Sequence, residues 1–366
     1  MAILHEKRLL VAAALVVAAI AGGAASSVAS AAVPSAVDGK IYGCYRNNAS
    51  LTDAKGALRI IDNANSACTG AETAINWSPT GSTTGAIRPD LAGKDLSGLS
   101  LDNRDLTGAN LSGSNLSNMR LHYVDMHNAN FTGANLTGLA VVGSTFQGAN
   151  FTNAHLDFDL VSRLVTSPYL NKLDTNVDMR NANFTNAYIA GPDVDGYAYE
   201  TDYRGATFNN TTIFGQIGNA NVSGIDFRTT HFLTNPAIGD YAGFADVDAS
   251  NANFSGMTLD HVTFVDYNMN LDHTNFSNTT FTNSLLRNTR QGTVGANFTN
   301  AVIKDSDFGD NRFMTADFTG AYIKDSSFSQ SRINDANFTG VTWINVVCPD
   351  ESNSDNNGGT CVGHSL

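Results

Sequence analysis

Oxygen-bearing side chains are closely spaced near the C-terminus, in a pattern that suggests a calcium site. Residues 353–358 read Asn-Ser-Asp-Asn-Asn-Gly, which fits the first half of a calcium-binding loop with Asn at its first position. The twelfth position is His364, where an acidic bidentate ligand belongs. A polar turn inside a disulfide loop is the alternative, and no other cofactor is expected. The candidate calcium ligands are the four residues Asp350, Asn353, Asp355 and Asn357.

No set of residues in the sequence predicts catalysis. Serine and threonine are abundant, but there is no G-x-S-x-G, no P-loop and no G-x-G-x-x-G that opens a helix. His122 and His127 lie five positions apart, and a five-residue repeat directs them to different sides of the chain. We therefore expect a protein that is not an enzyme.

The first 31 residues resemble a secretory signal peptide. Lys7 and Arg8 form a short basic region, residues 9–20 are apolar, and Ala29-Ser30-Ala31 is a small-residue cleavage site. We expect cleavage after Ala31 and a protein that is secreted, extracellular or held in the cell envelope. A membrane anchor is the alternative, although the apolar run is short for a bilayer span. No later segment is apolar enough to span a membrane.

The four cysteines follow this segment as two local pairs. An exported chain meets an oxidising compartment, which favours disulfides. Of the three connectivities that are possible, we expect Cys44–Cys68 and Cys348–Cys361, because each closes a short loop near one end of the chain. Zinc is disfavoured, since neither pair has C-x-x-C spacing.

The composition excludes several classes of protein. Charged residues make up 15% of the chain, 42% is hydrophobic, and the net charge is −13. This fraction of hydrophobic residues is large enough to form a buried core, which excludes a chain that is disordered throughout. A chain this acidic does not bind the phosphate backbone of a nucleic acid by releasing counterions. Nucleic acid is therefore not an expected partner.

An apolar residue recurs every five positions over long stretches. A small residue often lies two places earlier, as in Ala109-Asn110-Leu111-Ser112-Gly113. A period of five gives a helix no single buried face and does not match the two-residue period of a strand. The first run contains Leu91, Leu96, Leu101, Leu106, Leu111, Leu116, Leu121, Met126, Phe131, Leu136, Val141, Phe146, Phe151 and Leu156.

A four-sided coil explains this period. If the chain turns after every five residues, each side points one large and one small residue inward, and residues about 20 apart stack at the strand spacing of about 4.8 Å. Asn110, Asn130 and Asn150 should then form an outward ladder. Asp305 and Asp325 should also stack, with Lys304 and Lys324 beside them, as a solvated face.

These repeats resemble the pentapeptide-repeat family, whose A-[DN]-[LF]-x-x units form a right-handed quadrilateral parallel β-helix. The resemblance implies an all-β solenoid over most of residues 83–344, with about ten coils. Some members of this family are acidic rods that bind DNA gyrase as DNA mimics. The resemblance therefore also implies a gyrase-binding alternative, which the export signal opposes.

The expected organisation has four parts. A signal peptide (1–31) precedes a small β module (32–82) with strands near 41–45, 58–61 and 73–77. The solenoid (83–344) is interrupted by insertions at 157–178 and 233–250, and a polar cap (345–366) follows. We expect the five-residue register to end at Trp343.

We expect a secreted or cell-surface structural or interaction protein, monomeric or weakly oligomeric. Its partner would be an unknown protein or a cell-surface glycan. The alternatives are the gyrase binder and an extracellular glycan-binding module. Tyrosines that could stack on sugars are Tyr169, Tyr197, Tyr199 and Tyr241.

Overall fold

The computed structural model describes residues 41–46, 58–61, 72–77, 90–102, 104–157, 177–190, 201–234, 242–266, 268–287, 292–333 and 335–364. The chain divides into two compact units, Met1–Leu91 and Ala92–Leu366, each of which is described by itself. The expected signal peptide and the four tyrosines proposed for sugar stacking lie outside the described residues.

The first unit contains a three-stranded antiparallel sheet in the order β2-β1-β3. Its strands are β1 (Ile41–Arg46), β2 (Leu58–Ile61) and β3 (Glu72–Trp77), which lie where the sequence predicted strands. Cys44 is opposite Arg59 in this sheet. Cys68 lies outside the described residues, so the Cys44–Cys68 disulfide stays a prediction.

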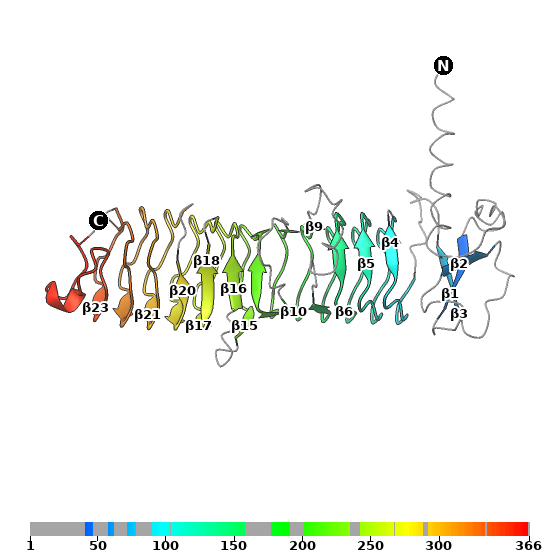
Figure 1. Cartoon of the computed structure of the whole chain (residues 1–366), viewed down its shortest axis with the longest axis horizontal. Coiled ribbons are helices and arrows are strands. Elements are labelled where there is room, and N and C mark those ends of the chain that lie inside the picture. The colour runs from blue at the N-terminus through cyan, green and yellow to red at the C-terminus, as the bar shows by residue number, and fades with distance from the viewer. Residues whose placement is uncertain are drawn as a thin grey trace, which may run out of the picture. The chain divides into compact units, whose positions relative to one another are not determined.

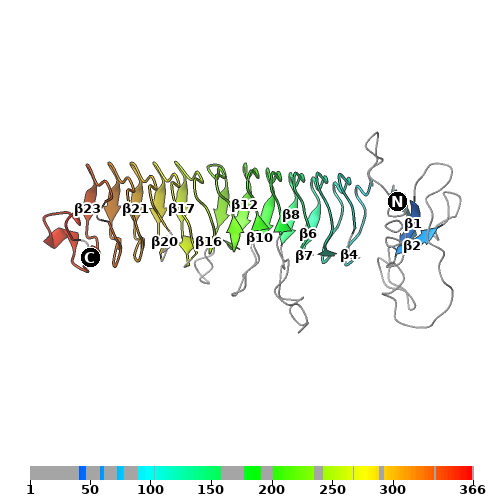
Figure 2. The same cartoon turned by 90° about the horizontal axis from the view of Figure 1, so that it is seen from above.

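The second unit is an all-β parallel solenoid, as predicted (Figures 1 and 2). Short strands alternate with tight turns. The strands are β4 (Ser100–Asp102), β5 (Arg120–His122), β6 (Asn135–Thr137), β7 (Ala140–Val142), β8 (His155–Asp157), β9 (Val177–Asp178), β10 (Tyr188–Ala190), β11 (Thr201–Asp202), β12 (Thr212–Phe214), β13 (Gln216–Gly218), β14 (Ala220–Asn221), β15 (His231–Leu233), β16 (Ala242–Ala245), β17 (Thr258–Asp260), β18 (Val262–Val265), β19 (Thr280–Thr282), β20 (Leu285–Leu286), β21 (Val302–Lys304), β22 (Tyr322–Lys324) and β23 (Thr342–Ile344).

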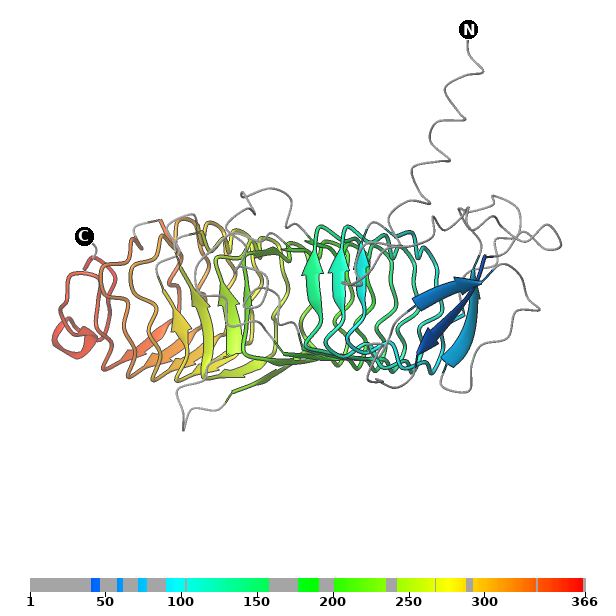
Figure 3. The same cartoon turned by 45° about the vertical axis from the view of Figure 1, so that its right-hand side comes forward.

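Each coil of the solenoid has four sides, as Figure 3 shows along the rod. Residues 20 apart are backbone partners on all four sides of the early coils. The pairs are Leu101 with Leu121, Asp105 with Asp125, Asn110 with Asn130, and Asn115 with Asn135. Four sides of five residues therefore make one coil of 20 residues, and each residue pairs with the residue at the same position in the next coil, as the sequence predicted.

Phenylalanine rings form a column inside the rod. On the side that begins with Phe131, each ring contacts the ring of the next coil, with centroids 4.6–5.2 Å apart. This distance equals the spacing of neighbouring strands, because the backbone sets the height of each ring. The column contains Phe131, Phe151, Phe184, Phe208, Phe227, Phe254, Phe276, Phe298, Phe318 and Phe338.

The small residue two places earlier makes room for each ring. Ala129, Ala149 and Ala182 are fully buried beside Phe131, Phe151 and Phe184. This confirms the role that the sequence pattern predicts for the small position.

Outward asparagines form the predicted ladder along the same side. The Asn130 amide donates to Asn110 Oδ1 at 3.3 Å, and the Asn150 amide donates to Thr132 Oγ1 at 3.1 Å. The ladder continues to Asn183, whose amide donates to Asn150 Oδ1 at 3.4 Å. Since Asn150 and Asn183 are backbone partners, the coil stack is continuous past the residues that separate them in sequence.

Both predicted insertions are too long. β8 extends to Asp157 and β9 begins at Val177, so Val177 and Asp178 belong to the solenoid. β16 begins at Ala242, and Phe244 is fully buried, so the solenoid resumes well before residue 250. Phe244 is the large core residue of β16, but the core position five residues later is Ala249, and this small residue concealed the register.

The repeat also extends beyond Trp343, which corrects the predicted end of the solenoid. Val347 is a parallel backbone partner of Ser327, and Cys348, five residues after Trp343, is fully buried. The chain then turns back, and Asn353 becomes an antiparallel partner of Val347. A short 3₁₀ helix, η2 (Ser354–Asn356), completes this end.

Many coil corners place one residue in the left-handed region of backbone conformation. Glycine and asparagine tolerate this conformation, while a β-branched residue is strained by it. Asn300 has φ +56° and Gly320, 20 residues later, has φ +70°. Thr315 occupies another corner with φ +56° and an exposed side chain.

We predict that Thr315→Asn stabilises the solenoid by about 1 kcal/mol, because asparagine is less strained at positive φ. The midpoint of urea unfolding measures the change. The reverse substitution, Asn300→Thr, should lower the midpoint by a similar amount. A lower midpoint for Thr315→Asn would contradict this account of the corners.

Candidate interaction surface

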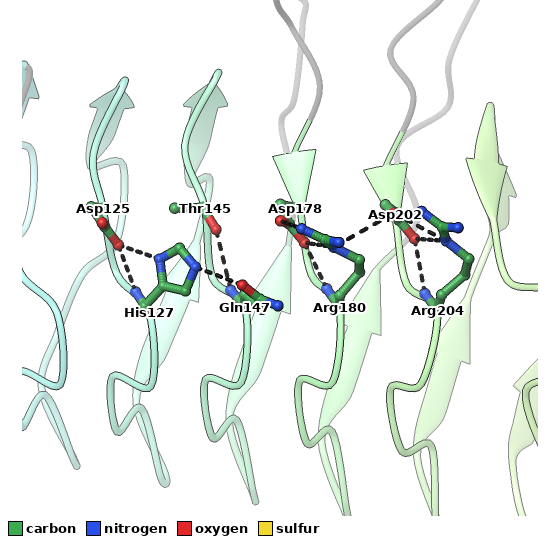
Figure 4. A network of polar contacts seen from close by, with 8 residues as sticks. All are labelled: Asp125, His127, Thr145, Gln147, Asp178, Arg180, Asp202 and Arg204. Carbon is green, nitrogen blue, oxygen red and sulfur yellow. Dashed lines mark hydrogen bonds and ion pairs between the residues drawn. The ribbon is translucent and has the colours of Figure 1, made fainter.

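One side of the early coils carries a continuous row of acidic, basic and amide side chains (Figure 4). In each coil an acceptor precedes the buried central residue and a donor follows it. Because neighbouring residues in an extended segment alternate in direction, both polar side chains point outward. We call this set the acid–base ladder: Asp125, His127, Thr145, Gln147, Asp178, Arg180, Asp202 and Arg204.

His127 is held at both ring nitrogens. Its Nδ1 lies 2.5 Å from Asp125 Oδ1, and its Nε2 lies 2.7 Å from Gln147 Oε1 on the next coil. Both partners are oxygen acceptors, so the doubly protonated ring satisfies both contacts. Burial acts to lower the pKa of His127, but the hydrogen bonds to Asp125 and Gln147 outweigh it and raise the pKa above its ordinary value.

The two arginines each form a bidentate pair with the aspartate of the same coil. Arg180 Nη2 lies 2.7 Å from Asp178 Oδ2, and Arg204 Nη2 lies 2.6 Å from Asp202 Oδ2. Arg180 Nε also lies 3.7 Å from Asp202 Oδ2, which joins the two coils. Hydrogen bonds from Arg204 hold the pKa of Asp202 below its ordinary value, against the opposing effect of burial.

The ladder is suited to recognition. The arginine side chains remain 42% and 55% exposed, so their charges contribute little to folding stability. Their carboxylate partners fix the direction in which each guanidinium lies. The surface therefore presents charges of both signs at fixed spacing.

The C-terminal candidate residues form the cap of the solenoid. Cys348 and Cys361 are joined by the predicted disulfide, with Cα atoms 5.2 Å apart. Asp350 accepts hydrogen bonds from Ser352 and His364, which lower its pKa to about 2.

The other three candidate calcium ligands also contact the cap itself. Asn353 Oδ1 accepts the backbone N–H of Asp355, and Asp355 Oδ1 accepts the backbone N–H of Asn345. The Asn357 amide donates to Ser352 Oγ. These contacts give all four residues a structural role in the cap, and calcium binding stays a prediction.

Asp305 and Asp325, which were predicted to stack, follow strands β21 and β22 and lie apart from the acid–base ladder. Lys304 and Lys324 are backbone partners, and Lys324 Nζ lies 3.2 Å from Asp325 Oδ2. Both aspartates line an open surface depression of ≈ 570 Å³ with Asp307. The charges are partly compensated, as expected for a solvated face.

The histidines are distributed over separate positions. The ring of His122 packs against Tyr123, while His127 belongs to the ladder, so the two do not meet. The ring of His155 stacks on Tyr188 with centroids 4.5 Å apart. In such a stack each ring covers one face of the other, and the ring edges remain open to solvent.

The described residues contain no group of three or more His, Cys, Asp or Glu side chains placed to hold a metal ion. In the same part of the chain, no helix is long and apolar enough to cross a membrane.

The five-residue period alone did not reveal the acid–base ladder. The sequence nevertheless contains a pattern that could have indicated it. Asp178-Met179-Arg180 and Asp202-Tyr203-Arg204 both consist of an aspartate, a buried core residue and an arginine. Asp226-Phe227-Arg228 repeats this triplet on another side of the rod.

Comparisons with known proteins support the assignment of the repeat. Residues 100–138 match the family model for pentapeptide repeats in eight copies, which confirms the resemblance. No curated protein matches the chain. The chain thus contains pentapeptide repeats and folds as a solenoid of that type.

Solved structures similar to this one are also pentapeptide-repeat proteins. HetL, involved in heterocyst differentiation regulation in the cyanobacterium Nostoc sp. strain PCC 7120, is 16% identical, covers 72% of this chain and 94% of its own, and has a TM-score of 0.26. QnrB1, a plasmid-mediated fluoroquinolone resistance protein, is 17% identical, covers 69% of this chain and 88% of its own, and has a TM-score of 0.25. Similarities this low carry no argument about function.

We predict that the stabilising effect of His127 depends on pH. Its pKa is raised on folding, so the contribution is full below the unfolded pKa of about 6.5 and is lost as pH rises through the folded value. His127→Thr should therefore lower the melting temperature more at about pH 5.5 than at about pH 8.5. Arg204→Thr is the control, since a guanidinium stays charged throughout. An equal effect of His127→Thr at both pH values would contradict the prediction.

We also predict that the Cys348–Cys361 bond stabilises the end of the rod. Closing a loop of 13 residues contributes about 3 kcal/mol. Cys361→Ala removes the bond and one buried sulfur atom but keeps the Cys348 side chain in the core, so most of its loss of stability in urea unfolding reports the bond. An unchanged midpoint would show that the disulfide does not stabilise the cap.

Proposed function

We propose that the chain is a secreted or cell-surface structural and interaction protein without enzymatic activity. Its solenoid would act as a spacer or a binding surface for an unknown protein or a cell-surface glycan. The observation that carries this proposal is the array of outward side chains that bond to one another along the rod. The Asn130–Asn110 and Arg204–Asp202 contacts are examples on two different sides.

The array favours recognition over reaction for a physical reason. A catalytic nucleophile or base needs an activated group with free access to a substrate. In this solenoid, hydroxyls such as those of Thr132 and Thr152 donate to the asparagine of their own coil at 2.6 Å. Side chains held in this way give a regular polar surface.

Export is supported by two features. The first is the basic, apolar and small-residue order of residues 1–31. The second is the Cys348–Cys361 disulfide, since such bonds form in oxidising compartments. Export would also separate this chain from gyrase, the partner in the alternative that the family resemblance implies.

We predict that the mature protein begins at Ala32 and is found outside the cytoplasm. The full chain is expressed in a bacterium, the medium, envelope and cytoplasm are separated, and the N-terminus is sequenced. An Ala29→Arg/Ala31→Arg variant is the control, because it removes the small residues of the cleavage site. An intact Met1 in the cytoplasm would overturn export and make a gyrase supercoiling assay the next experiment. A glycan array with the exported protein then distinguishes a glycan from a protein partner.

A further inference from the structure

The side of the rod that holds the acid–base ladder has a regular polarity. In seven successive coils the residue before the core position accepts a hydrogen bond from the backbone N–H of the residue after it. The acceptor row contains Asp105, Asp125, Thr145, Asp178, Asp202, Asn221 and Asp248. The donor row contains Thr107, His127, Gln147, Arg180, Arg204, Ser223 and Ser250.

We propose that this side is a self-association surface and that its partner is a second copy of this chain. The two rods would lie side by side and parallel, related by a two-fold axis along the rod direction. Such an axis exchanges left and right across the interface while it keeps each coil at the same height. The acceptor row of one copy therefore faces the donor row of the other in every coil.

The resulting contacts are complementary in charge. Asp178 of one copy meets Arg180 of the other, and Asp202 meets Arg204. An isologous interface requires this kind of self-complementary surface. The two rows are about 6.6 Å apart, since they are two residues apart along an extended segment.

The charges also select the orientation of the two rods. If the rods were antiparallel, the two-fold axis would lie across them and each row would face its own kind. Asp178 and Asp202 would then meet aspartates, and Arg180 and Arg204 would meet arginines. Like charges placed opposite one another are unfavourable, so the antiparallel arrangement is excluded.

The ladder has binding capacity left for a second partner. A guanidinium has five N–H donors, and Arg204 uses its Nε and Nη2 on Asp202. Arg204 is 55% exposed, so its remaining donors face solvent. A carboxylate of the second copy can bind there without displacing the first.

The size of the surface predicts a weak dimer. Seven coils span about 30 Å, and a side about 10 Å wide gives about 300 Å² for each copy. Stable dimers bury about 800 Å² for each partner. Most of the attraction is therefore between exposed charges, and it should decrease as salt screens them.

Sedimentation of the purified full chain tests this proposal. We expect a reversible monomer–dimer equilibrium at low ionic strength, with a dissociation constant that rises at least about tenfold in about 0.5 M salt. This measurement needs no substitution and is independent of whether the chain is exported. A protein that stays monomeric at high concentration and low salt would overturn the proposal.

Charge reversal on the ladder gives a sharper test. Arg180→Asp/Arg204→Asp should abolish dimers, because both rows become acidic. Asp178→Lys/Asp202→Lys should do the same with basic rows, while an equimolar mixture of the two variants should form a heterodimer. Circular dichroism and thermal unfolding confirm that each variant is folded.

The matched control is Arg228→Asp. Arg228 pairs with Asp226 at 2.7 Å and is 55% exposed, as Arg204 is, but it lies on another side of the rod. This variant should dimerise as the original chain does. The proposal fails if Arg228→Asp removes the dimer, if Arg180→Asp/Arg204→Asp retains it, or if the mixture of folded variants does not associate.

Discussion

The fixed height of one coil is the constraint on which the rest of the structure depends. Parallel backbone hydrogen bonds set this height at about 4.8 Å. Each residue then lies directly above its counterpart, whatever the side chain. Phe298 and Phe318 therefore stack with centroids 4.6 Å apart, and Asn130 reaches Asn110. The same constraint aligns Asp178 with Asp202 and so creates the acid–base ladder.

The sequence predicted the features that repeat at constant spacing. The five-residue period identified the four-sided coil, the buried small positions and the asparagine ladder, because all three follow from counting by five. The pairing of Cys348 with Cys361 followed from their proximity in sequence. Other features depend on how much chain lies between two coils. Asp178 stacks on Thr145 although 33 residues separate them, and no count from sequence alone predicts that neighbour.

Local composition concealed two further parts of the solenoid. Ala249 takes the core position five residues after Phe244 without the usual large side chain, so the segment was assigned to an insertion. Cys348 continues the register, but a cysteine in a polar tail was assigned to a cap. Both interpretations hold in part, since Cys348 continues the buried core above Phe328 and also forms the disulfide. Cys348 therefore belongs both to the core of the solenoid and to its cap.

A single column of coils continues past the segment between Leu156 and Val177, since Leu156 is a backbone partner of Ile189. Labels at Thr152 and Thr185 report on this continuity, because Asn183 donates to Thr152 Oγ1 at 3.2 Å and to Asn150. Spin labels on Thr152→Cys/Thr185→Cys, in a chain whose other cysteines stay oxidised, report their separation through dipolar broadening. Adjacent coils predict strong broadening, as between labels on Thr319→Cys and Thr339→Cys. An unbroadened spectrum for the first pair would contradict the continuous column.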